Sequence, residues 1–325
     1  MQDAVIGIDL GGTSTKFGLV SKEGELLAYD AIPTDSTKTY EHFFEHLYHQ
    51  ADKLQHKVDT DIAIQGIGVG APAGNYCTGT IEDASNLHWE PNIPVTKTLA
   101  QVSNLPTVLM NDANASAEGE RLYGAAQGME NFISITLGTG LGCGIVIDGR
   151  LVVGQRGHAG EIGHTTVFYD GRECSCGRLG CLETYVSGPG LVATVQELLS
   201  KKDIESTLGN MRIADMDAKS ITAAARQQDQ LAREAFNYTG KILGLKLADM
   251  VTTLNPEAII ISGGLAKAGA LILEPAKRSM EDHLLEMFQD EVTVLPSSLT
   301  EKNAAILGAS ASIWNTLERE QTPYV

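Results

Sequence analysis

The hydrophobic positions at the start of the chain fall into short runs separated by tight turns. Apolar runs occupy residues 5–10, 17–20 and 26–29, and two short glycine-containing turns separate them. Short apolar runs joined in this way are typical of antiparallel strands. The pattern therefore predicts that the chain begins with three antiparallel strands.

The same pattern occurs a second time in the middle of the chain. A run from Asn131 to Leu137 leads into a glycine-rich turn, and two more apolar runs follow at 145–147 and 151–153. We interpret this as a degenerate internal duplication, which predicts two related domains, each with a glycine-rich turn facing the other. A cleft between two such domains is the default position for a ligand.

The remaining hydrophobic pattern predicts further strands and helices between and after these two copies. Strands are expected at 62–69, 107–110, 258–262 and 291–295. Helices are expected at 40–57, 94–102, 188–199, 230–254 and 302–317, with another from Asn111 through Leu122 and one beginning near Lys267 or Ala270. Glycines at 240 and 244 predict a slight break in the helix over 230–254, and residues 200–217 show no clear pattern.

A cluster of one histidine and three cysteines follows the second copy. His164, Cys174, Cys176 and Cys181 supply the nitrogen and sulfur ligands that zinc prefers, in the number that completes a tetrahedron. Four protein ligands leave no open position, so the sequence predicts a structural zinc ion that holds a loop. Three ordinary buried cysteines beside a loop histidine are the alternative, but that reading does not explain the number, type and crowding of these residues.

Two carboxylates flank this cluster. Glu161 lies three residues before His164, and Glu183 lies two residues after Cys181. Zinc does not need them as ligands. A metal-bound loop would hold both side chains in fixed positions, which suits hydrogen bonding to a polar ligand.

Composition and charge exclude several classes of protein. The 325 residues are 43% hydrophobic and 20% charged, which is typical of a soluble globular protein of two domains. With 24 basic and 41 acidic residues, the net charge of −17 disfavours nucleic acid and anionic membranes as partners. The clustered cysteines argue against a disulfide framework, and we find neither a transmembrane run nor a secretion signal, so we expect a cytoplasmic protein.

Three strand ends carry residues suited to nucleotide or substrate binding, although each alone is a weak signal. The Gly11-Gly12 turn with Thr13 offers backbone N–H groups to an anion, but a simple hairpin would look the same. Gly263-Gly264 follows an uncharged, buried strand. Asp112 follows another strand at a helix start, where it is either a functional carboxylate or only a helix cap.

Together, the glycine-rich strand ends at 11–13, 138–144 and 263–264 can surround one nucleotide between two duplicated domains. This is the layout of the actin-like, sugar-kinase ATPase architecture. Within it, the segment from Glu161 to Glu183 resembles the signatures of the ROK family, named for repressors, open reading frames and kinases. Asn86-Leu-His-Trp89 and Asn111-Asp112-Ala-Asn114 are most similar to the glucokinases of that family. The resemblance covers the chain from Asp9 to the terminal helix.

The resemblance implies an α/β fold with duplicated actin-like (ribonuclease H-like) ATPase domains and a cleft between them. The smaller domain would comprise residues 1–112 and 303–325, and the larger one residues 113–302 with the zinc loop 161–183. Asp112 would be the catalytic base, and Asp9 would hold Mg²⁺ through water. The implied sugar-binding residues are Asn86, Asn111, Asp112, Glu161, His164 and Glu183. The implied ATP-binding residues are Asp9, Gly11, Gly12, Thr13, Lys16, Thr139, Gly140, Gly263 and Gly264.

The expected activity is ATP-dependent phosphorylation of a hexose at its 6-hydroxyl, with glucose as the first candidate. N-acetylmannosamine, N-acetylglucosamine and fructose remain alternative acceptors, and a sugar-responsive regulator or an ATPase switch would be a different class of protein. Acidic charge and the lack of a helix-turn-helix region before Val5 count against the regulator. We expect a homodimer or homotetramer. The segment from Gly70 to Asn75 lacks a second proline that is common in the family's glucokinases, so residues 76–80 are expected to shape the sugar pocket differently.

Overall fold

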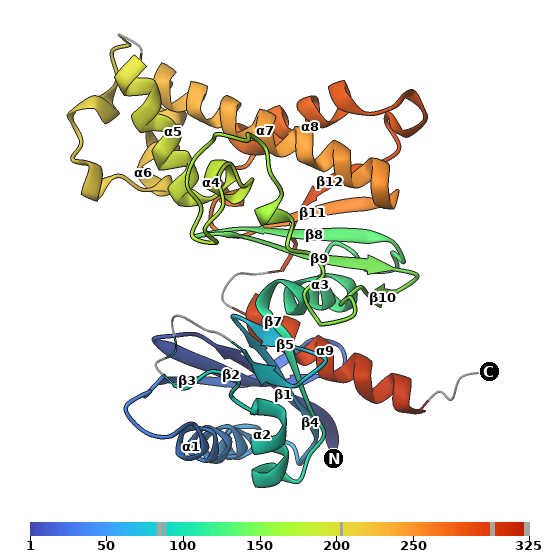
Figure 1. Cartoon of the computed structure of the whole chain (residues 1–325). Helices are drawn as coiled ribbons and strands as arrows, with labels where there is room; N and C mark the ends of the chain where they lie inside the picture. The colour runs from blue at the N-terminus through green and yellow to red at the C-terminus, as the bar shows by residue number, and fades with distance from the viewer. Residues whose placement is uncertain (83–86, 88, 202–203, 300–302, 322–325) are drawn as a thin grey trace.

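The computed structural model describes the chain except for residues 83–86, 88, 202–203, 300–302 and 322–325, and for residues 320 and 321 it describes only the backbone. Two five-stranded sheets dominate the structure (Figure 1). Both sheets are built on the same plan.

The first sheet combines an antiparallel half with a parallel half. Its strand order is β3-β2-β1-β4-β7. The first three strands pair antiparallel, as predicted, whereas β4 and β7 run parallel to β1. The strands are β1 (Gln2–Leu10), β2 (Ser14–Ser21), β3 (Leu26–Pro33), β4 (Ile62–Ala71) and β7 (Thr107–Asn111).

The second sheet repeats this plan with the order β10-β9-β8-β11-β12. Strand β8 pairs antiparallel with β9 and parallel with β11, as β1 does with β2 and β4. The strands are β8 (Phe132–Leu137), β9 (Leu141–Ile147), β10 (Arg150–Leu151), β11 (Ala258–Ser262) and β12 (Thr293–Pro296). The internal duplication and the actin-like α/β class are therefore confirmed.

The helices form three layers around the two sheets (Figure 1). Helices α1 (Tyr40–Asp52) and α2 (Val95–Ser103) cover the outer face of the first sheet, while α3 (Asp112–Tyr123) and α9 (Ala304–Gln321) lie between the sheets. The outer face of the second sheet is covered by α4 (Glu183–Val186), α5 (Gly188–Lys201), α6 (Ala218–Arg226), α7 (Gln230–Leu254) and α8 (Ala270–His283).

Short elements complete the chain. A two-stranded sheet of β5 (Gly74–Asn75) and β6 (Thr80–Ile81) follows β4. Single 3₁₀ turns are found at Lys53–Lys57, Ile162–His164, Thr207–Asn210, Ile213–Asp215, Ala266–Ala268 and Glu286–Phe288. Among the described helices, none is long and apolar enough to cross a membrane.

Several of the predicted element boundaries are wrong. The helix predicted over 40–57 ends at Asp52 and continues as a 3₁₀ turn, and the third strand of the second copy covers only 150–151. Helix α6 lies just beyond the segment without clear pattern, and it begins at a capping box formed by Asp217 and Ser220. The predicted division at residues 112/113 and 302/303 stays a prediction, and α3 contacts both α9 and the second sheet.

Helix α7 is continuous, although its glycines predicted a break. Gly240 and Gly244 face α8, which packs closely along α7. A Cβ atom on Gly244 would lie 2.2 Å from the carbonyl oxygen of Ala276, closer than any van der Waals contact allows. The glycines are therefore needed for helix–helix contact rather than for a kink.

This packing predicts that Gly244→Ala destabilises the protein, although alanine favours an exposed helix by about 1 kcal/mol over glycine. Overpacking a core costs about 1–3 kcal/mol, and here the obstructing atom belongs to the backbone and cannot rotate away. Urea unfolding followed by circular dichroism measures the difference. Gly209→Ala is the control, because its Cβ would meet nothing closer than 3.7 Å. An unchanged or raised midpoint for Gly244→Ala would contradict the packing argument.

Candidate functional site

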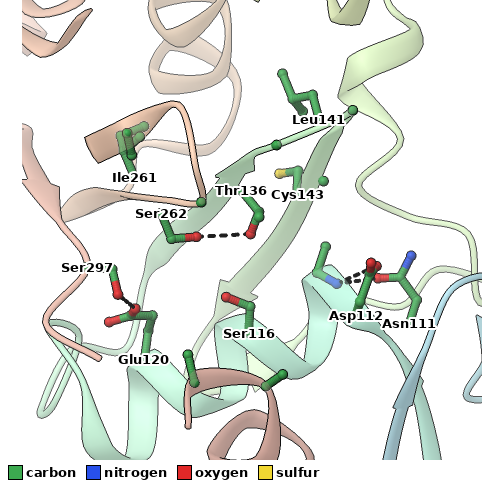
Figure 2. Close-up of a pocket in the computed structure, with 18 of the residues that line it drawn as sticks. Asn111, Asp112, Ser116, Glu120, Thr136, Leu141, Cys143, Ile261, Ser262 and Ser297 are labelled. Carbon is green, nitrogen blue, oxygen red and sulfur yellow. Dashed lines mark hydrogen bonds between the residues drawn. The ribbon is translucent and has the colours of Figure 1, made fainter. Parts of the chain in front are cut away.

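A cavity of about 900 Å³ lies between the two sheets and receives residues from both halves of the chain (Figure 2). Its walls are the carboxyl ends of β1, β7, β8, β11 and β12, the start of β9, one face of α3, the start of α9, and the loop that leads to Glu161. Ligands of α/β sheets bind at such strand ends, because the chain leaves the sheet there and loops can present side chains. The cavity is therefore the candidate active site.

Asp112 lies at the junction of β7 and α3, where the end of the strand leads directly into the helix. The helix cap is Asn111, whose side-chain Oδ1 accepts hydrogen bonds from the N–H groups of Ala113 at 2.8 Å and Asn114 at 3.1 Å. The alternative reading of Asp112 as the cap is thus wrong. Burial raises the pKa of the Asp112 carboxyl, although a hydrogen bond from the N–H of Ala113 lowers it in part. A carboxylate with a raised pKa holds a proton more readily than an ordinary one, as a general base must.

Asp9, near the end of β1, contributes a second carboxylate to the same cavity. Burial raises its pKa, the ammonium group of Lys16 lowers it, and the charge of Asp112 raises it further. The Nζ atom of Lys16 lies 3.8 Å from Oδ2 of Asp9, but its side chain is half exposed and does not line the cavity. Two acidic groups in one cavity, of which Asp112 raises the pKa of Asp9, favour a cation between or beside them.

The turn between β8 and β9 carries Thr139 and Gly140 and is fixed to the predicted zinc loop. The N–H of Leu141 donates to Oε2 of Glu183 at 2.9 Å. A Cβ atom on Gly140 would lie only 2.5 Å from the same carboxylate oxygen. Glycine at 140 thus lets the turn approach Glu183, and one contact joins a predicted ATP-binding turn to a predicted sugar-binding carboxylate.

His164 and the three cysteines of the cluster come together as the sequence predicted. Their ligand atoms all lie within 4.8 Å of one another. Cys174 Sγ lies 3.6 Å from His164 Nδ1, and the Sγ atoms of Cys176 and Cys181 are 3.6 Å apart. A zinc tetrahedron with Zn–S bonds of about 2.3 Å has edges of about 3.8 Å, so these side chains fit the ion.

The orientation and chemistry of this cluster agree with that fit. Nδ1 of His164 faces the thiols, and Nε2 lies 3.9 Å from Oε2 of Glu161. The N–H of Arg178 lowers the pKa of Cys176 to about 6, whereas burial raises that of Cys181 to about 12. A bound cation would allow all three thiols to ionise together.

The structure therefore brings together most of the predicted site residues, but not all. Those that line the cavity are Asp9, Asn111, Asp112, Thr139, Gly140, Glu161, Glu183 and Gly263. Those that do not are Gly11, Gly12, Thr13, Lys16, His164 and Gly264. The Gly11-Gly12 turn is instead held by Thr34, whose hydroxyl donates to the carbonyl of Gly11 at 2.6 Å. Asn86 lies outside the described residues.

Several polar residues that line the cavity were not predicted. Figure 2 shows Thr136 and Ser262, whose hydroxyls are 3.0 Å apart, and Ser297, which donates a hydrogen bond to Glu120. The sequence held a signal for these residues. Ser262 and Ser297 lie at or just after strand ends, and Glu120 lies two helical turns after Asp112 on α3. Cys143 also lines the cavity, and burial raises the pKa of its thiol to about 12.

The segment that departs from the family pattern forms a contact between the two halves of the chain. The side-chain amide of Asn75 donates to the carbonyl of Arg156 at 2.7 Å and to Glu82 at 2.9 Å. Nε2 of His158 lies 3.3 Å from the carboxylate of Glu82. These contacts connect the β5–β6 hairpin to the loop that leads to Glu161, so this segment helps to place one wall of the cavity.

Comparisons with known proteins agree on one family. The sequence profile of the ROK family matches residues 5–316. A glucokinase of Halalkalibacterium halodurans is 36% identical over 88% of this chain and 87% of its own length. A xylose repressor of Caldicellulosiruptor bescii is 30% identical over 95% of this chain and 78% of its own. A crystal structure of a ROK family glucokinase from Streptomyces griseus with glucose and AMPPNP has a TM-score of 0.76 and 34% identity, covering 94% of this chain and 98% of that one.

The raised pKa of Asp112 predicts a pH-dependent gain in stability for Asp112→Asn. The folded protein binds the Asp112 proton more tightly than the unfolded chain does, so wild-type stability falls as pH rises through the folded pKa. Asparagine removes this burial cost and can still accept the hydrogen bond from Ala113. We expect Asp112→Asn to unfold at a higher temperature than wild type at pH 8, with the gap narrowing as pH falls through the raised pKa of the folded protein.

Thermal unfolding followed by circular dichroism measures this gap. Asp148→Asn is the matched control, because Asp148 lies in the exposed turn between β9 and β10. A gap of the same size for both variants, or one independent of pH, would contradict the assignment of a desolvated, charged Asp112.

Proposed function

This chain belongs to the ROK family, and we propose that it is an ATP-dependent hexokinase that transfers the γ-phosphoryl group of ATP to the 6-hydroxyl of glucose. The observation that carries the proposal is Asp112, a carboxylate with a pKa raised by desolvation, in one cavity with Glu161, Glu183 and the Thr139-Gly140 turn. Phosphoryl transfer requires mainly positioning, charge neutralisation and an oriented nucleophile. The likeness to glucokinases over most of the chain supports the same activity.

The cavity residues divide into three tasks. Asp112 accepts the proton of the 6-hydroxyl as that oxygen attacks the γ-phosphorus. Asn111, Glu161 and Glu183 bind the other sugar hydroxyls, since amides and carboxylates pair well with them. We keep His164 as a residue whose Nε2 closure of the two halves would bring to a sugar hydroxyl, since it does not line the cavity itself. Asn86 would join from the segment outside the described residues.

The phosphates of ATP belong at the glycine-rich turns. Thr139, Gly140 and Gly263 line the cavity, and their backbone N–H groups would bind anionic oxygens there. We keep Gly11, Gly12, Thr13, Lys16 and Gly264 as ATP-binding residues that closure of the two halves would bring to the nucleotide. Mg²⁺ would neutralise phosphate charge, and Asp9 would hold it through water.

We propose that the cluster of His164, Cys174, Cys176 and Cys181 holds one zinc ion. Four protein ligands close the coordination sphere, so the metal would stabilise the loop instead of activating water. Nδ1 of His164 would bind the metal and leave Nε2 for the sugar side. Because Glu161 and Glu183 lie close to the ligands in sequence, the metal would hold their backbone.

Other acceptors and other classes of function remain candidates for experiment. N-acetylmannosamine, N-acetylglucosamine or fructose would need the same base, so only turnover separates them from glucose. A sugar-responsive regulator or an ATPase switch would need no proton acceptor at the sugar hydroxyl, and the desolvation cost of the Asp112 carboxylate would then serve no catalytic purpose. Free cysteines and an acidic surface support a cytoplasmic, glycolytic enzyme that binds neither nucleic acid nor membranes, and we expect a homodimer or homotetramer.

A coupled assay of ATP turnover against a panel of hexoses tests this function. We expect glucose to give the highest kcat/KM. Asp112→Asn should lower kcat by about a hundredfold to ten-thousandfold, because a general base contributes about that much to the rate. Glucose should still raise the melting temperature of the variant, and Asp148→Asn should keep the wild-type rate. Near-normal kcat in Asp112→Asn would remove Asp112 from the mechanism, and no turnover with any hexose would refute the kinase.

The zinc proposal predicts one zinc ion per chain by elemental analysis. Cys176→Ser should lose the metal and raise the KM for glucose by about ten- to a hundredfold, with little change in the KM for ATP, because the glucose-binding carboxylates flank the loop. Asp148→Asn is the control, since Asp148 is exposed and lies outside the cluster and the cavity. Metal-free wild-type protein with all thiols reactive, or a folded Cys176→Ser with unchanged glucose KM, would contradict this role.

A further inference from the structure

We propose that Arg172 is a positioning residue for the sugar site. It fixes the predicted zinc loop, residues 161–183 and called the metal loop below, to the helices behind Glu183 independently of the metal. The inference rests on the proposed function, because it concerns the geometry of the same sugar-binding carboxylates. It goes further by assigning a role to a residue that neither lines the main cavity nor belongs to the metal cluster.

The guanidinium of Arg172 is bonded on every side. Its Nη1 donates to the carbonyls of Thr184 at 2.7 Å and Gly190 at 3.0 Å, and its Nη2 donates to Oγ1 of Thr194 at 2.9 Å. Its Nε donates to the carboxylate of Glu197 at 2.8 Å. The side chain is only 13% exposed, although it belongs to a loop. Such a set of contacts holds the loop in one orientation.

Arg172 also stacks on Tyr185, whose hydroxyl accepts a hydrogen bond from the N–H of Arg172 at 2.9 Å. The guanidinium carbon lies 4.4 Å from the centre of the Tyr185 ring. Tyr185 is buried and belongs to the short helix α4, which begins with Glu183. The contact therefore binds the loop to the same helix that presents a sugar-binding carboxylate.

The position of Arg172 in the chain makes it a second anchor of the metal loop. It lies between His164 and Cys174, and its carbonyl accepts a hydrogen bond from the N–H of Gly180 at 2.8 Å, next to Cys181. One side of the loop thus meets the metal ligands, and the other side meets α4 and α5. In Figure 1 this loop is the yellow-green chain that passes around α4.

The second anchor is adjacent to both substrates' binding residues. A cavity of about 560 Å³ beside the main one is lined by Arg172 and shares Thr139 and Glu183 with it. Arg172 binds the carbonyl of Thr184, the residue that follows Glu183 in the chain. The carboxylate of Glu183 accepts a hydrogen bond from the N–H of Leu141. A shift of the loop or of α4 would therefore move Glu183 relative to the sugar, and displacements of about 1 Å cost up to about a hundredfold in activity.

The contacts require the shape of the guanidinium more than its charge. Three of the four side-chain partners are neutral oxygens spread around a planar fork, and lysine cannot reach them simultaneously. The one charged partner, Glu197, is 43% exposed, and ion pairs near water contribute little. The charge-retaining substitution is thus expected to fail, while removal of the charged partner is expected to be tolerated.

The test compares Arg172→Lys and Arg172→Ala with the control Glu197→Gln, all as zinc-loaded full-length protein. We expect both Arg172 variants to raise the KM for glucose by about ten- to a hundredfold, with kcat and the KM for ATP changed less than about twofold. Zinc content should stay at the wild-type value, because the ligands are intact. Glu197→Gln should keep the wild-type KM for glucose.

Hydrogen exchange of the amides in residues 161–183 gives a second readout that needs no turnover. Exchange should quicken in both Arg172 variants and stay at the wild-type rate in Glu197→Gln, with and without a zinc chelator. Unchanged exchange together with unchanged glucose KM overturns the inference while the kinase stands. Arg172→Lys that retains full activity, or two Arg172 variants that both unfold by circular dichroism, also overturns it. Wild-type protein that phosphorylates no hexose refutes the function on which the inference rests.

Discussion

Holding two acidic side chains in one cavity is the constraint on which the rest of this site depends. Asp9 lies near the end of β1 and Asp112 directly after β7 in the same sheet, and desolvation raises the pKa of both. Neighbouring desolvated charges of one sign lower the stability of the fold, so the surrounding structure must hold them there. Rigid strand ends do this well, because β1 and β7 are fixed on either side of β4 within the sheet. The desolvation cost of the two carboxylates is consistent with a site that is stabilised when a cation and a substrate bind.

Duplication explains how one chain surrounds such a site. Each half supplies a sheet of the same order, and the helices α3 and α9 fill the space between them. The carboxyl ends of both sets of strands therefore open onto one cavity, and each half contributes a different function. In the proposed enzyme the first half brings the acidic residues, and the second brings the phosphate-binding turns and the sugar-binding glutamates.

The metal loop shows how a long irregular segment can be made precise enough for substrate binding. Residues 152–182 contain little regular structure, so few backbone hydrogen bonds of a helix or sheet hold them. Three kinds of contact take the place of those backbone hydrogen bonds. They are the histidine–cysteine cluster, the guanidinium of Arg172, and the hydrogen bond from Leu141 to Glu183. Each acts on a different side of the loop, so together they define its position where one alone would leave it free to rotate.

Sequence alone was sufficient wherever the chemistry is local. The cluster of His164, Cys174, Cys176 and Cys181 lies within eighteen residues, and the repeated strand–turn pattern follows from apolar runs, so both could be predicted. The placement of Asp112 at a strand end was also predictable, but its neighbour Asn111 turned out to be the helix cap. Local spacing fixes such features because the atoms involved are separated by only a few bonds along the backbone.

Tertiary structure decided which distant residues meet. The sequence offered three glycine turns as equals, yet Gly140 and Gly263 line the cavity whereas Gly11 and Gly12 do not. Ser297 and Glu120 are separated by 177 positions, and the bond from Leu141 to Glu183 spans 42. Nothing in the spacing of such residues indicates contact, because their distance depends on how sheets and helices pack. The sequence therefore determined the histidine–cysteine cluster, the strand ends and the fold class. Packing determined the walls of the cavity and the contacts that anchor the metal loop.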